Sequence, residues 1–598
     1  MKTNTVELPV QTESVTLDPI AAPETVTTAE HDVASQTSTP LVDVANLNIW
    51  FADRHGTRRQ VVHNVDLKIH PGECVAIIGE SGSGKSVTAR TLIGLTGEKA
   101  HIETDSADVF GRDIATLVDR DWKKLRGNQI GYILQDALVS LDPLRTVGSE
   151  IGEALRAHGA PRAGLRETVE ALLAEVGVPE PALRARQRPD QLSGGLRQRA
   201  LIASAIANDP PLIIADEPTT ALDVTVQAEV LDVLAERQRD GTAILLISHD
   251  FSVVSRLATK IFVMKGGQIV ETGNTDEILR APQHPYTQEL LGALPSGRTR
   301  GQYLTSQARD RAKNRPDQPA VASHHQQTAA SGPIISAQGL TKRYRTPDGG
   351  HHTAVDDVSF ELEAGQVLGI VGESGSGKST TGSIILGLST PDSGQVLFDG
   401  KPWSALPEHQ RRAQRRQITA VYQDPLSSFD PRWSAERVLV DALDATKRPG
   451  LFAGRKARSR YHASLREQAV YWADIVGLAP QHLAKHPLQL SGGQRQRLAI
   501  ARALAPNPQV VVMDEAVSAL DVSVQAQVLD LLTDLRKSLH TAFIFISHDL
   551  GVIHHLSDQI LVLKDGQTVE YGHAEEVFNQ PEHAYTQRLI ASVGAYAL

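Results

Sequence analysis

The chain has 598 residues, of which 41% are hydrophobic and 22% charged, so we expect ordinary globular protein in at least two large domains. Its net charge of −10, from 60 basic and 70 acidic residues, argues against a general nucleic-acid-binding protein, and its one cysteine, Cys74, excludes an intrachain disulfide. No apolar signal region opens the sequence and no stretch approaches about 18 apolar residues, so we expect a cytosolic protein that reaches a membrane only through partners.

The first 40 residues are rich in Thr, Val, Glu, Ser and Pro and show no helical or strand period, so we expect residues 1–40 to be a disordered tail. The octapeptide GESGSGKS then occurs twice, at 79–86 and at 372–379. A repeat with so long a period indicates a duplicated domain. We predict a first repeat at residues 41–295, a flexible linker at 296–333 and a second repeat at 334–598.

Within each repeat the apolar runs predict an α/β fold. Short buried strands are expected at 74–79, 212–216 and 243–248, and again at 367–372, 510–514 and 542–547. Helices should follow the octapeptides, at about 85–95 and 378–388. Runs of this kind, separated by helical patterns, predict a mainly parallel sheet. The stretches 135–192 and 423–490 are mostly helical in pattern, and each predicts a helical lobe inserted into the sheet domain.

The octapeptide matches the phosphate-binding loop template GxxxxGK[ST]. In this template glycines let backbone N–H groups wrap the phosphates, the lysine reaches the β and γ oxygens, and the serine hydroxyl binds Mg²⁺. The predicted nucleotide-binding residues are Gly79, Ser81, Gly82, Gly84, Lys85 and Ser86 in the first loop and Gly372, Ser374, Gly375, Gly377, Lys378 and Ser379 in the second. Each repeat therefore predicts one site for ATP with Mg²⁺.

An acidic pair ends an apolar strand in each repeat. Asp216 and Asp514 are placed where a carboxylate helps to hold Mg²⁺. The adjacent Glu217 and Glu515 are placed to polarise the attacking water, which makes them candidate catalytic residues. An acidic pair is a weak signal alone, and its occurrence after both phosphate loops strengthens it.

The motifs LSGGLRQR (192–199) and LSGGQRQR (490–497) resemble the signature of ATP-binding-cassette (ABC) ATPases. The resemblance covers nearly the whole chain and implies two tandem ABC nucleotide-binding domains. Each domain would have a mainly parallel P-loop sheet core, an antiparallel β subdomain and an inserted helical lobe. It also implies that each signature caps the ATP bound to the opposite repeat, so that the two repeats pair within one chain. The signature residues are Ser193, Gly194, Gly195, Ser491, Gly492 and Gly493.

The same resemblance assigns roles to further residues. Phe51 and Tyr344 would stack on adenine, and Gln135 and Gln423 would sense Mg²⁺ and the transporter partner. The histidines of the two ISHD motifs would contact the γ-phosphate as catalytic residues, and an aspartate in each ALDV motif would line the interface between the repeats. These residues are His249 and His548, and Asp223 and Asp521.

Each repeat ends in a similar extension, APQHPYTQELLGALP at 281–295 and QPEHAYTQRLIASV at 580–593. These extensions resemble the C-terminal motif of the ATPase subunits of oligopeptide and dipeptide importers, here fused as in glutathione-type importers. The resemblance implies two transmembrane permease subunits and an extracytoplasmic peptide-binding protein as partners, and a peripheral position on the cytoplasmic face of the cell membrane. Some relatives carry cysteines for an iron–sulfur cluster, which Cys74 alone cannot build. Nickel or a peptide conjugate stays open as an alternative cargo.

Two functions of other classes compete with transport. A tandem-cassette translation factor would carry a long charged helical linker, whereas the linker here is short, Pro-broken and rich in Gln and Ala. A DNA-repair ATPase of the same superfamily would need zinc cysteines or long coiled coils, and the sequence has neither. Both hypotheses therefore have less support from the sequence than the hypothesis of an ATPase that drives a peptide importer.

Overall fold

The computed structural model describes residues 39–52, 56–97, 99–134, 140–219, 222, 224–314, 332–346, 349–412, 414–444, 455–518 and 520–591. The predicted disordered tail therefore falls almost wholly outside the described residues. Within the described part of the chain, no helix is both long and apolar enough to cross a membrane.

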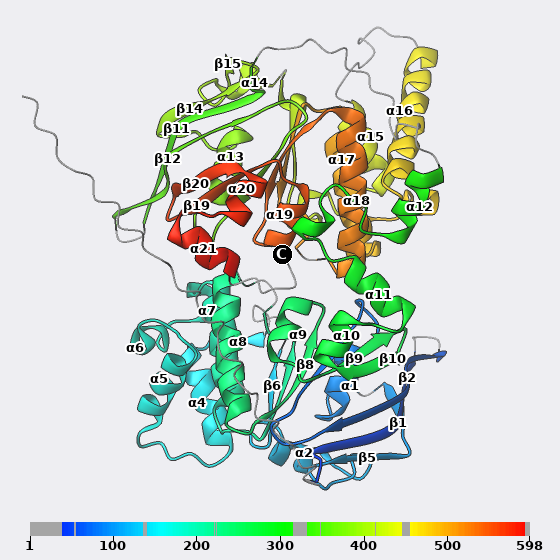
Figure 1. Cartoon of the computed structure of the whole chain (residues 1–598), viewed down its shortest axis with the longest axis vertical. Helices are drawn as coiled ribbons and strands as arrows, with labels where there is room; N and C mark the ends of the chain where they lie inside the picture. The colour runs from blue at the N-terminus through cyan, green and yellow to red at the C-terminus, as the bar shows by residue number, and fades with distance from the viewer. Residues whose placement is uncertain are drawn as a thin grey trace, which may run out of the picture. The chain divides into compact units, whose positions relative to one another are not determined.

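The first repeat alternates strands and helices along the chain (Figure 1). Its elements are β1 (Val42–Ala52), β2 (Arg58–Ile69), β3 (Cys74–Ile78), α1 (Lys85–Thr91), β4 (Ala100–Glu103), β5 (Ser106–Val109), α2 (Asp119–Leu125), β6 (Ile130–Ile133), α4 (Val147–Ala157), α5 (Leu165–Glu175), α6 (Pro181–Arg184), η1 (Pro189–Gln191), α7 (Gly194–Ile206), β7 (Leu212–Asp216), α8 (Val224–Arg239), β8 (Ala243–Ser248), α9 (Phe251–Leu257), β9 (Lys260–Lys265), β10 (Gln268–Asn274), α10 (Thr275–Arg280) and α11 (Pro285–Gly292).

The strands of the first repeat form two sheets. The larger sheet has the order β10-β9-β3-β8-β7-β6. Adjacent strands in it are parallel, except that β10 pairs antiparallel with β9. In the smaller sheet β1 pairs antiparallel with β2, β4 and β5. The sequence of β3 is continuously apolar because both faces of the strand are buried. Cys74, Ala76 and Ile78 pack in one hydrophobic core, and Val75 and Ile77 pack in another.

The second repeat contains the same kinds of elements. They are β11 (Ile335–Arg345), β12 (His351–Leu362), β13 (Val367–Val371), α13 (Lys378–Ile385), β14 (Ser393–Phe398), β15 (Lys401–Pro402), α14 (Glu408–Arg411), η3 (Arg415–Gln417), β16 (Ile418–Val421), η4 (Leu426–Ser428), α15 (Ala435–Asp444), α16 (Arg455–Ile475), η5 (Pro480–His482), η6 (Pro487–Gln489), α17 (Gly492–Leu504), β17 (Val510–Asp514), α18 (Val522–Leu539), β18 (Ala542–Ile546), α19 (Leu550–Leu556), β19 (Gln559–Lys564), β20 (Gln567–His573), α20 (Ala574–Asn579) and α21 (Ala584–Ala591).

The larger sheet of the second repeat has the topology of the larger sheet of the first, whereas the smaller sheets differ in their last strand, because β5 pairs with β1 and β15 pairs with β14. The larger has the order β16-β17-β18-β13-β19-β20, with only β20 antiparallel, and the smaller has the order β12-β11-β14-β15. These sheets confirm the predicted α/β fold with a mainly parallel core and an antiparallel subdomain in each repeat. The shared order places the strand before each phosphate loop, β3 or β13, inside its sheet, where the loop leaves the carboxyl end.

A helical lobe lies to one side of each repeat, as the sequence predicts. In Figure 1, helices α4, α5 and α6 (cyan) lie apart from strands β1 and β2 (dark blue) within the first repeat. Within the second, α15 and α16 (yellow) lie apart from β11, β12 and β14. The helices after the phosphate loops are shorter than expected, because Gly94 and Gly387 adopt left-handed φ angles of 63° and 65° just beyond α1 and α13.

The first part of the predicted flexible linker has ordered structure, which corrects that prediction for residues 296–314. This segment contains η2 (Gly297–Thr299) and α12 (Ser306–Asn314), whereas 315–331 lie outside the described residues. The buried Asp530 of α18 accepts hydrogen bonds from Leu304 N at 2.7 Å, Thr305 N at 2.9 Å and Thr305 Oγ1 at 2.6 Å. The side chain of Leu304 packs in the core of the second repeat. These tertiary contacts order a segment whose own composition favours a linker.

Replacing Asp530 with alanine is expected to release this segment, because three hydrogen bonds to one buried carboxylate are lost together. Limited trypsin digestion should then cut the segment at least about ten-fold faster than in the wild type, at Arg298, Arg300, Arg309, Arg311 or Lys313. The control is Asp232→Ala, because Asp232 on α8 instead pairs with the half-exposed Arg256. Equal cleavage of both variants would contradict the proposed anchor.

Candidate functional site

The phosphate loop of each repeat begins at a glycine that no other residue could replace. Gly79 and Gly372 both have a φ of 151°, and a Cβ atom at either position would lie 2.1 Å from Met264 O or 2.2 Å from Leu563 O. The chain can therefore turn out of β3 and β13 and pass close under the neighbouring strand only with glycine there. The loop then ends at Gly84 and Gly377, directly before α1 and α13, as the template requires.

The loop lysines lie folded against their own loops. Lys85 Nζ donates to Gly79 O at 2.7 Å and to Glu80 O at 2.9 Å. Lys378 Nζ makes the same two contacts, with Gly372 O at 2.7 Å and Glu373 O at 2.7 Å. Burial lowers the pKa of Lys85, and the acidic groups nearby counteract this effect only in part. Both ammonium groups are thus buried beside the space that the loop encloses.

Oxygen donors for a metal ion meet at the carboxyl end of β7 and β17. Ser86 Oγ donates to Asp216 Oδ1 at 2.8 Å, and Ser379 Oγ donates to Asp514 Oδ1 at 3.3 Å. Burial raises the pKa of both aspartates. Asp216 is buried and Asp514 half-buried, and a carboxylate next to a hydroxyl is a ligand set that suits Mg²⁺, which prefers oxygen ligands. The donor set therefore fits the predicted metal, although no group of three or more His, Cys, Asp or Glu residues among the described residues forms a metal cluster by itself.

The candidate catalytic glutamates pair with the ISHD histidines. His249 Nδ1 lies 3.3 Å from Glu217 Oε1, and His548 Nδ1 lies 3.4 Å from Glu515 Oε1. Burial by itself lowers the pKa of each histidine, but the hydrogen bond and charge of the glutamate outweigh burial and raise it. In the second repeat the hydrogen bond from His548 lowers the pKa of Glu515.

Both glutamates have left-handed backbones, with φ angles of 51° at Glu217 and 48° at Glu515. Residues other than glycine rarely adopt this conformation, which carries a cost in free energy. The backbone N of each glutamate donates at 2.9 Å to a carbonyl at the end of the next strand, Ile247 O or Ile546 O, and this bond holds the strained turn in place. The turn sets the position of each carboxylate beside its histidine.

In the second repeat, one cavity of about 510 Å³ gathers the predicted site residues. Its lining includes Tyr344, Ser374, Gly375, Gly377, Lys378, Ser379, Gln423, Glu515 and His548. Gln423 Nε2 donates to Glu515 Oε2 at 2.6 Å. Gln135, the predicted counterpart of Gln423, and Asp223 lie outside the described residues.

The two candidate adenine-stacking residues differ in exposure. Tyr344 at the end of β11 is 44% exposed and lines the cavity. Phe51 at the end of β1 is half-buried and packs partly against the core of the first repeat. An exposed aromatic ring is better placed to stack on a base, so Tyr344 presents the clearer platform, and both stacking roles stay predictions.

The signature turns cap the helices that follow them. Ser193 Oγ accepts from Leu196 N at 3.3 Å at the start of α7, and Ser491 Oγ accepts from Gln494 N at 3.3 Å at the start of α17. A Cβ atom at Gly493 would lie 2.5 Å from Val524 Cγ1, so the second turn packs tightly against α18. Helix N-termini of this kind attract anions.

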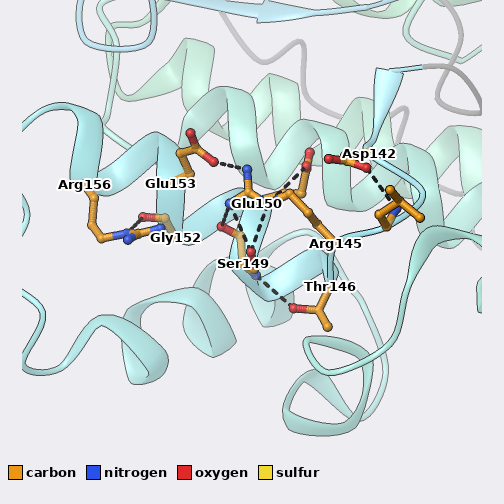
Figure 2. Close-up of polar contacts among 9 residues, drawn as sticks. Asp142, Arg145, Thr146, Ser149, Glu150, Gly152, Glu153 and Arg156 are labelled. Carbon is orange, nitrogen blue, oxygen red and sulfur yellow. Dashed lines mark hydrogen bonds and ion pairs between the residues drawn. The ribbon is translucent and has the colours of Figure 1, made fainter.

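Figure 2 shows a network of polar side chains where the first helical lobe begins. Thr146 caps α4 by accepting a hydrogen bond from Ser149 N at 3.3 Å. Arg145 Nε donates to Ser149 Oγ at 3.2 Å, and the same guanidinium pairs with Glu153. The network fixes the entry into α4 a few residues after the segment 135–139, which contains the first predicted glutamine.

The family comparison agrees with this geometry. The family model described as ABC transporter matches residues 62–220 and 355–518, which is more than half of the chain. The chain belongs to the ABC transporter family. A second model, described as the C-terminal region of oligopeptide/dipeptide transporters, matches residues 270–319 and 569–596 of this ABC protein.

Curated relatives resemble the chain over almost its full length. The glutathione import ATP-binding protein GsiA of Salmonella paratyphi A is 39% identical, over 93% of this chain and 90% of the relative. The oligopeptide transport ATP-binding protein OppD of Mycobacterium tuberculosis is 38% identical, over 93% of this chain and 98% of the relative. A solved dimeric ATP-binding cassette with ADP and phosphate bound is 28% identical over 40% of this chain and 99% of its own, with a TM-score of 0.36.

The sequence motifs of this ABC protein did not indicate three tyrosines near its nucleotide sites. Tyr132 OH donates to Asp216 Oδ2 at 3.0 Å, and Tyr286 OH and Tyr585 OH each accept from a backbone N–H of a phosphate loop. Tyr286 and Tyr585 belong to the duplicated extension, so the duplication was a signal that they matter. Their contact with the loops joins residues more than 200 positions apart and could not be found from spacing.

Proposed function

We propose that the chain is the ATP-hydrolysing, energy-coupling subunit of an ABC importer for peptides. The observation that carries this proposal is the match of both extensions to the C-terminal region of oligopeptide/dipeptide transporters, each beside one ABC transporter segment. The names of the relatives, which describe glutathione import and oligopeptide transport, support the same substrate class. No observation favours a translation factor or a DNA-repair ATPase.

ATP with Mg²⁺ is the proposed nucleotide at both sites. The phosphate loop would bind the β- and γ-phosphates through its backbone N–H groups and through Lys85 or Lys378, with the ammonium still held at the first carbonyl of its loop. Ser86 and Asp216, or Ser379 and Asp514, would hold the metal ion. A metal ion held there would supply positive charge to offset the negative charge that develops during phosphoryl transfer.

Hydrolysis requires an attacking water held in line with the γ-phosphate. Glu217 and Glu515 would accept a hydrogen bond from that water and orient it. His249 and His548 would contact the γ-phosphate while their Nδ1 atoms hold the glutamates. The strained backbone at each glutamate supports a pre-organised carboxylate, because a fixed acceptor costs little reorganisation during the reaction.

The proposed partners are two transmembrane permease subunits and an extracytoplasmic peptide-binding protein, with the chain peripheral on the cytoplasmic face of the membrane. The permeases would dock on the helical lobes and the adjoining glutamine segments, at 135–139 and around Gln423. The ordered polar network in Figure 2 supports a firm docking surface beside the first of these segments. Dipeptides, oligopeptides and glutathione-like conjugates are the proposed cargo, and a nickel complex is the weaker alternative.

The function is tested with the permeases reconstituted in liposomes beside the chain. Peptides delivered by the binding protein are expected to stimulate ATP hydrolysis, with glutathione and a nickel chelate as comparison cargoes. Hydrolysis that no peptide stimulates, in vesicles that stay sealed and contain all subunits, would contradict the peptide-import proposal.

The chain is expected to move from the soluble fraction to the membrane fraction of a cell lysate when its permeases are expressed with it. Expressed alone, it should stay in the supernatant after ultracentrifugation, because none of its described helices could cross a membrane. Expressed with its permeases, it should sediment with the membranes. Membrane retention in cells that lack the permease genes would contradict this location, and co-sedimentation with ribosomes would favour the translation factor.

A further inference from the structure

The two C-terminal extensions touch the phosphate loops of their own repeats through one tyrosine each. Tyr286, near the start of α11, accepts a hydrogen bond at its OH from Glu80 N at 3.2 Å. Tyr585, near the start of α21, accepts the same bond from Glu373 N at 3.0 Å. Glu80 and Glu373 are the second residues of the two loops, so the contact is duplicated with the repeat.

The tyrosines are held rigidly enough to act on the loops. Both side chains are 3% exposed, and Lys265 Nζ and Lys564 Nζ lie 4.3 Å and 5.3 Å from the ring centroids. Burial raises the pKa of Tyr286 to about 12, so its phenol stays neutral at physiological pH.

The backbone that carries each tyrosine is fixed as well. His284 Nδ1 accepts from Tyr286 N at 3.1 Å, and His583 Nδ1 accepts from Tyr585 N at 3.1 Å, so each histidine caps the helix of its extension. A glutamate on the last strand of each larger sheet accepts hydrogen bonds from backbone N–H groups that precede the helix. Glu271 accepts from Gln283 N and His284 N, and Glu570 accepts from Glu582 N and His583 N.

The tyrosine and the loop lysine contact the same peptide group. The group between Gly79 and Glu80 donates its N–H to Tyr286, and its C=O, on Gly79, accepts from Lys85 Nζ at 2.7 Å. The N–H and C=O of a trans peptide point in opposite directions, so fixing one fixes the other. Lys378 and Tyr585 contact the group between Gly372 and Glu373 in the same way.

We propose that Tyr286 and Tyr585 are positioning residues for nucleotide binding: each orients the first peptide group of its phosphate loop and, through that carbonyl, the loop lysine. The inference rests on the proposed function, because it assumes that the loops bind nucleotide. It gives the importer-type extension a role at the ATP site of its own repeat.

The test uses the full chain with one site disabled and MANT-ADP as the probe. In a Lys378→Ala background, where the first site is the intact one, Tyr286→Phe is expected to weaken MANT-ADP binding about five-fold, the effect of about one lost hydrogen bond. Tyr585→Phe should do the same in a Lys85→Ala background. Phenylalanine keeps the ring and its packing, so the melting temperature should stay within about 2 °C of the parent. With both sites intact, the double Tyr→Phe chain should show a raised KM for ATP and a kcat within about two-fold of wild type.

The matched control is Tyr571→Phe on β20. Tyr571 OH also accepts a hydrogen bond from a backbone N–H, Glu361 N at 3.4 Å, but it is 40% exposed and contacts no phosphate-loop residue in the described structure. Unchanged affinity for MANT-ADP in both Tyr→Phe variants would overturn the inference. If the melting temperature fell while the affinity stayed unchanged, the tyrosines would only anchor the extension, and the inference would also be overturned. If the unsubstituted chain fails to bind MANT-ADP, the proposed function itself fails.

Discussion

Replacing Glu217 and Glu515 with glutamine in the same chain is expected to lower ATP hydrolysis by about 100-fold or more, while ATP still binds. Glutamine keeps the size of the side chain but removes the negative charge that would orient the attacking water. It also removes the partner that raises the pKa of His249 and of His548. The phosphate loops and their lysines are untouched, so the affinity for ATP should persist.

Steady-state phosphate release and binding of MANT-ATP measure the two effects separately. The control is Glu236→Gln on α8, because Glu236 is exposed and its carboxylate lies 4.0 Å from the guanidinium of Arg239. Each single variant, Glu217→Gln or Glu515→Gln, should keep part of the turnover if both sites hydrolyse ATP. Wild-type phosphate release from the double variant would contradict the assignment of both glutamates.

Much of the fold could be predicted because the central strands are buried on both faces. The apolar runs at 212–216 and 510–514 are the strands β7 and β17 with the predicted bounds. The helix after the first loop was predicted too long, because Leu92 and Ile93 continue its apolar pattern. Gly94 ends it instead, at a position where a Cβ atom would lie 2.5 Å from the Trp122 ring, and this contact depends on tertiary structure.

The residues missed by the sequence depend on contacts between distant segments. The segment 296–314 is polar and poor in strong motifs, and its order comes from Asp530 and from the burial of Leu304 in the second repeat. The tyrosines of the extensions belong to a motif that the sequence displays, but the loop amides they bind are not part of any local pattern. The chemistry of the phosphate loops could be predicted because the sequence template itself encodes it. The tyrosine contacts that hold the loops in position could not be predicted from any local pattern.

Ser193→Arg is expected to damage the site that contains Lys378 and to spare the site that contains Lys85. Among the described residues that line the cavity at Lys378, none comes from the signature turn Ser491–Gly493 of the same repeat. The resemblance to ABC ATPases implies that each signature caps the nucleotide of the opposite repeat, so Ser193 is expected to serve the site that contains Lys378. The linker joins the repeats at an effective concentration on the order of millimolar, so pairing within one chain should outcompete pairing between chains.

Single-glutamate variants separate the two sites. In a Glu217→Gln chain the remaining turnover belongs to the site with Lys378 and Glu515, and adding Ser193→Arg should lower it by at least about ten-fold, because the bulky cation displaces the anion-binding turn. In a Glu515→Gln chain, Ser193→Arg should leave the turnover of the other site largely in place. Ser491→Arg is the matched control, with the reverse pattern.

The ATP-trapped double Glu→Gln chain should have the mass of one chain by light scattering. Loss of turnover only in the Glu515→Gln background, together with a two-chain mass, would mean that like repeats pair across chains.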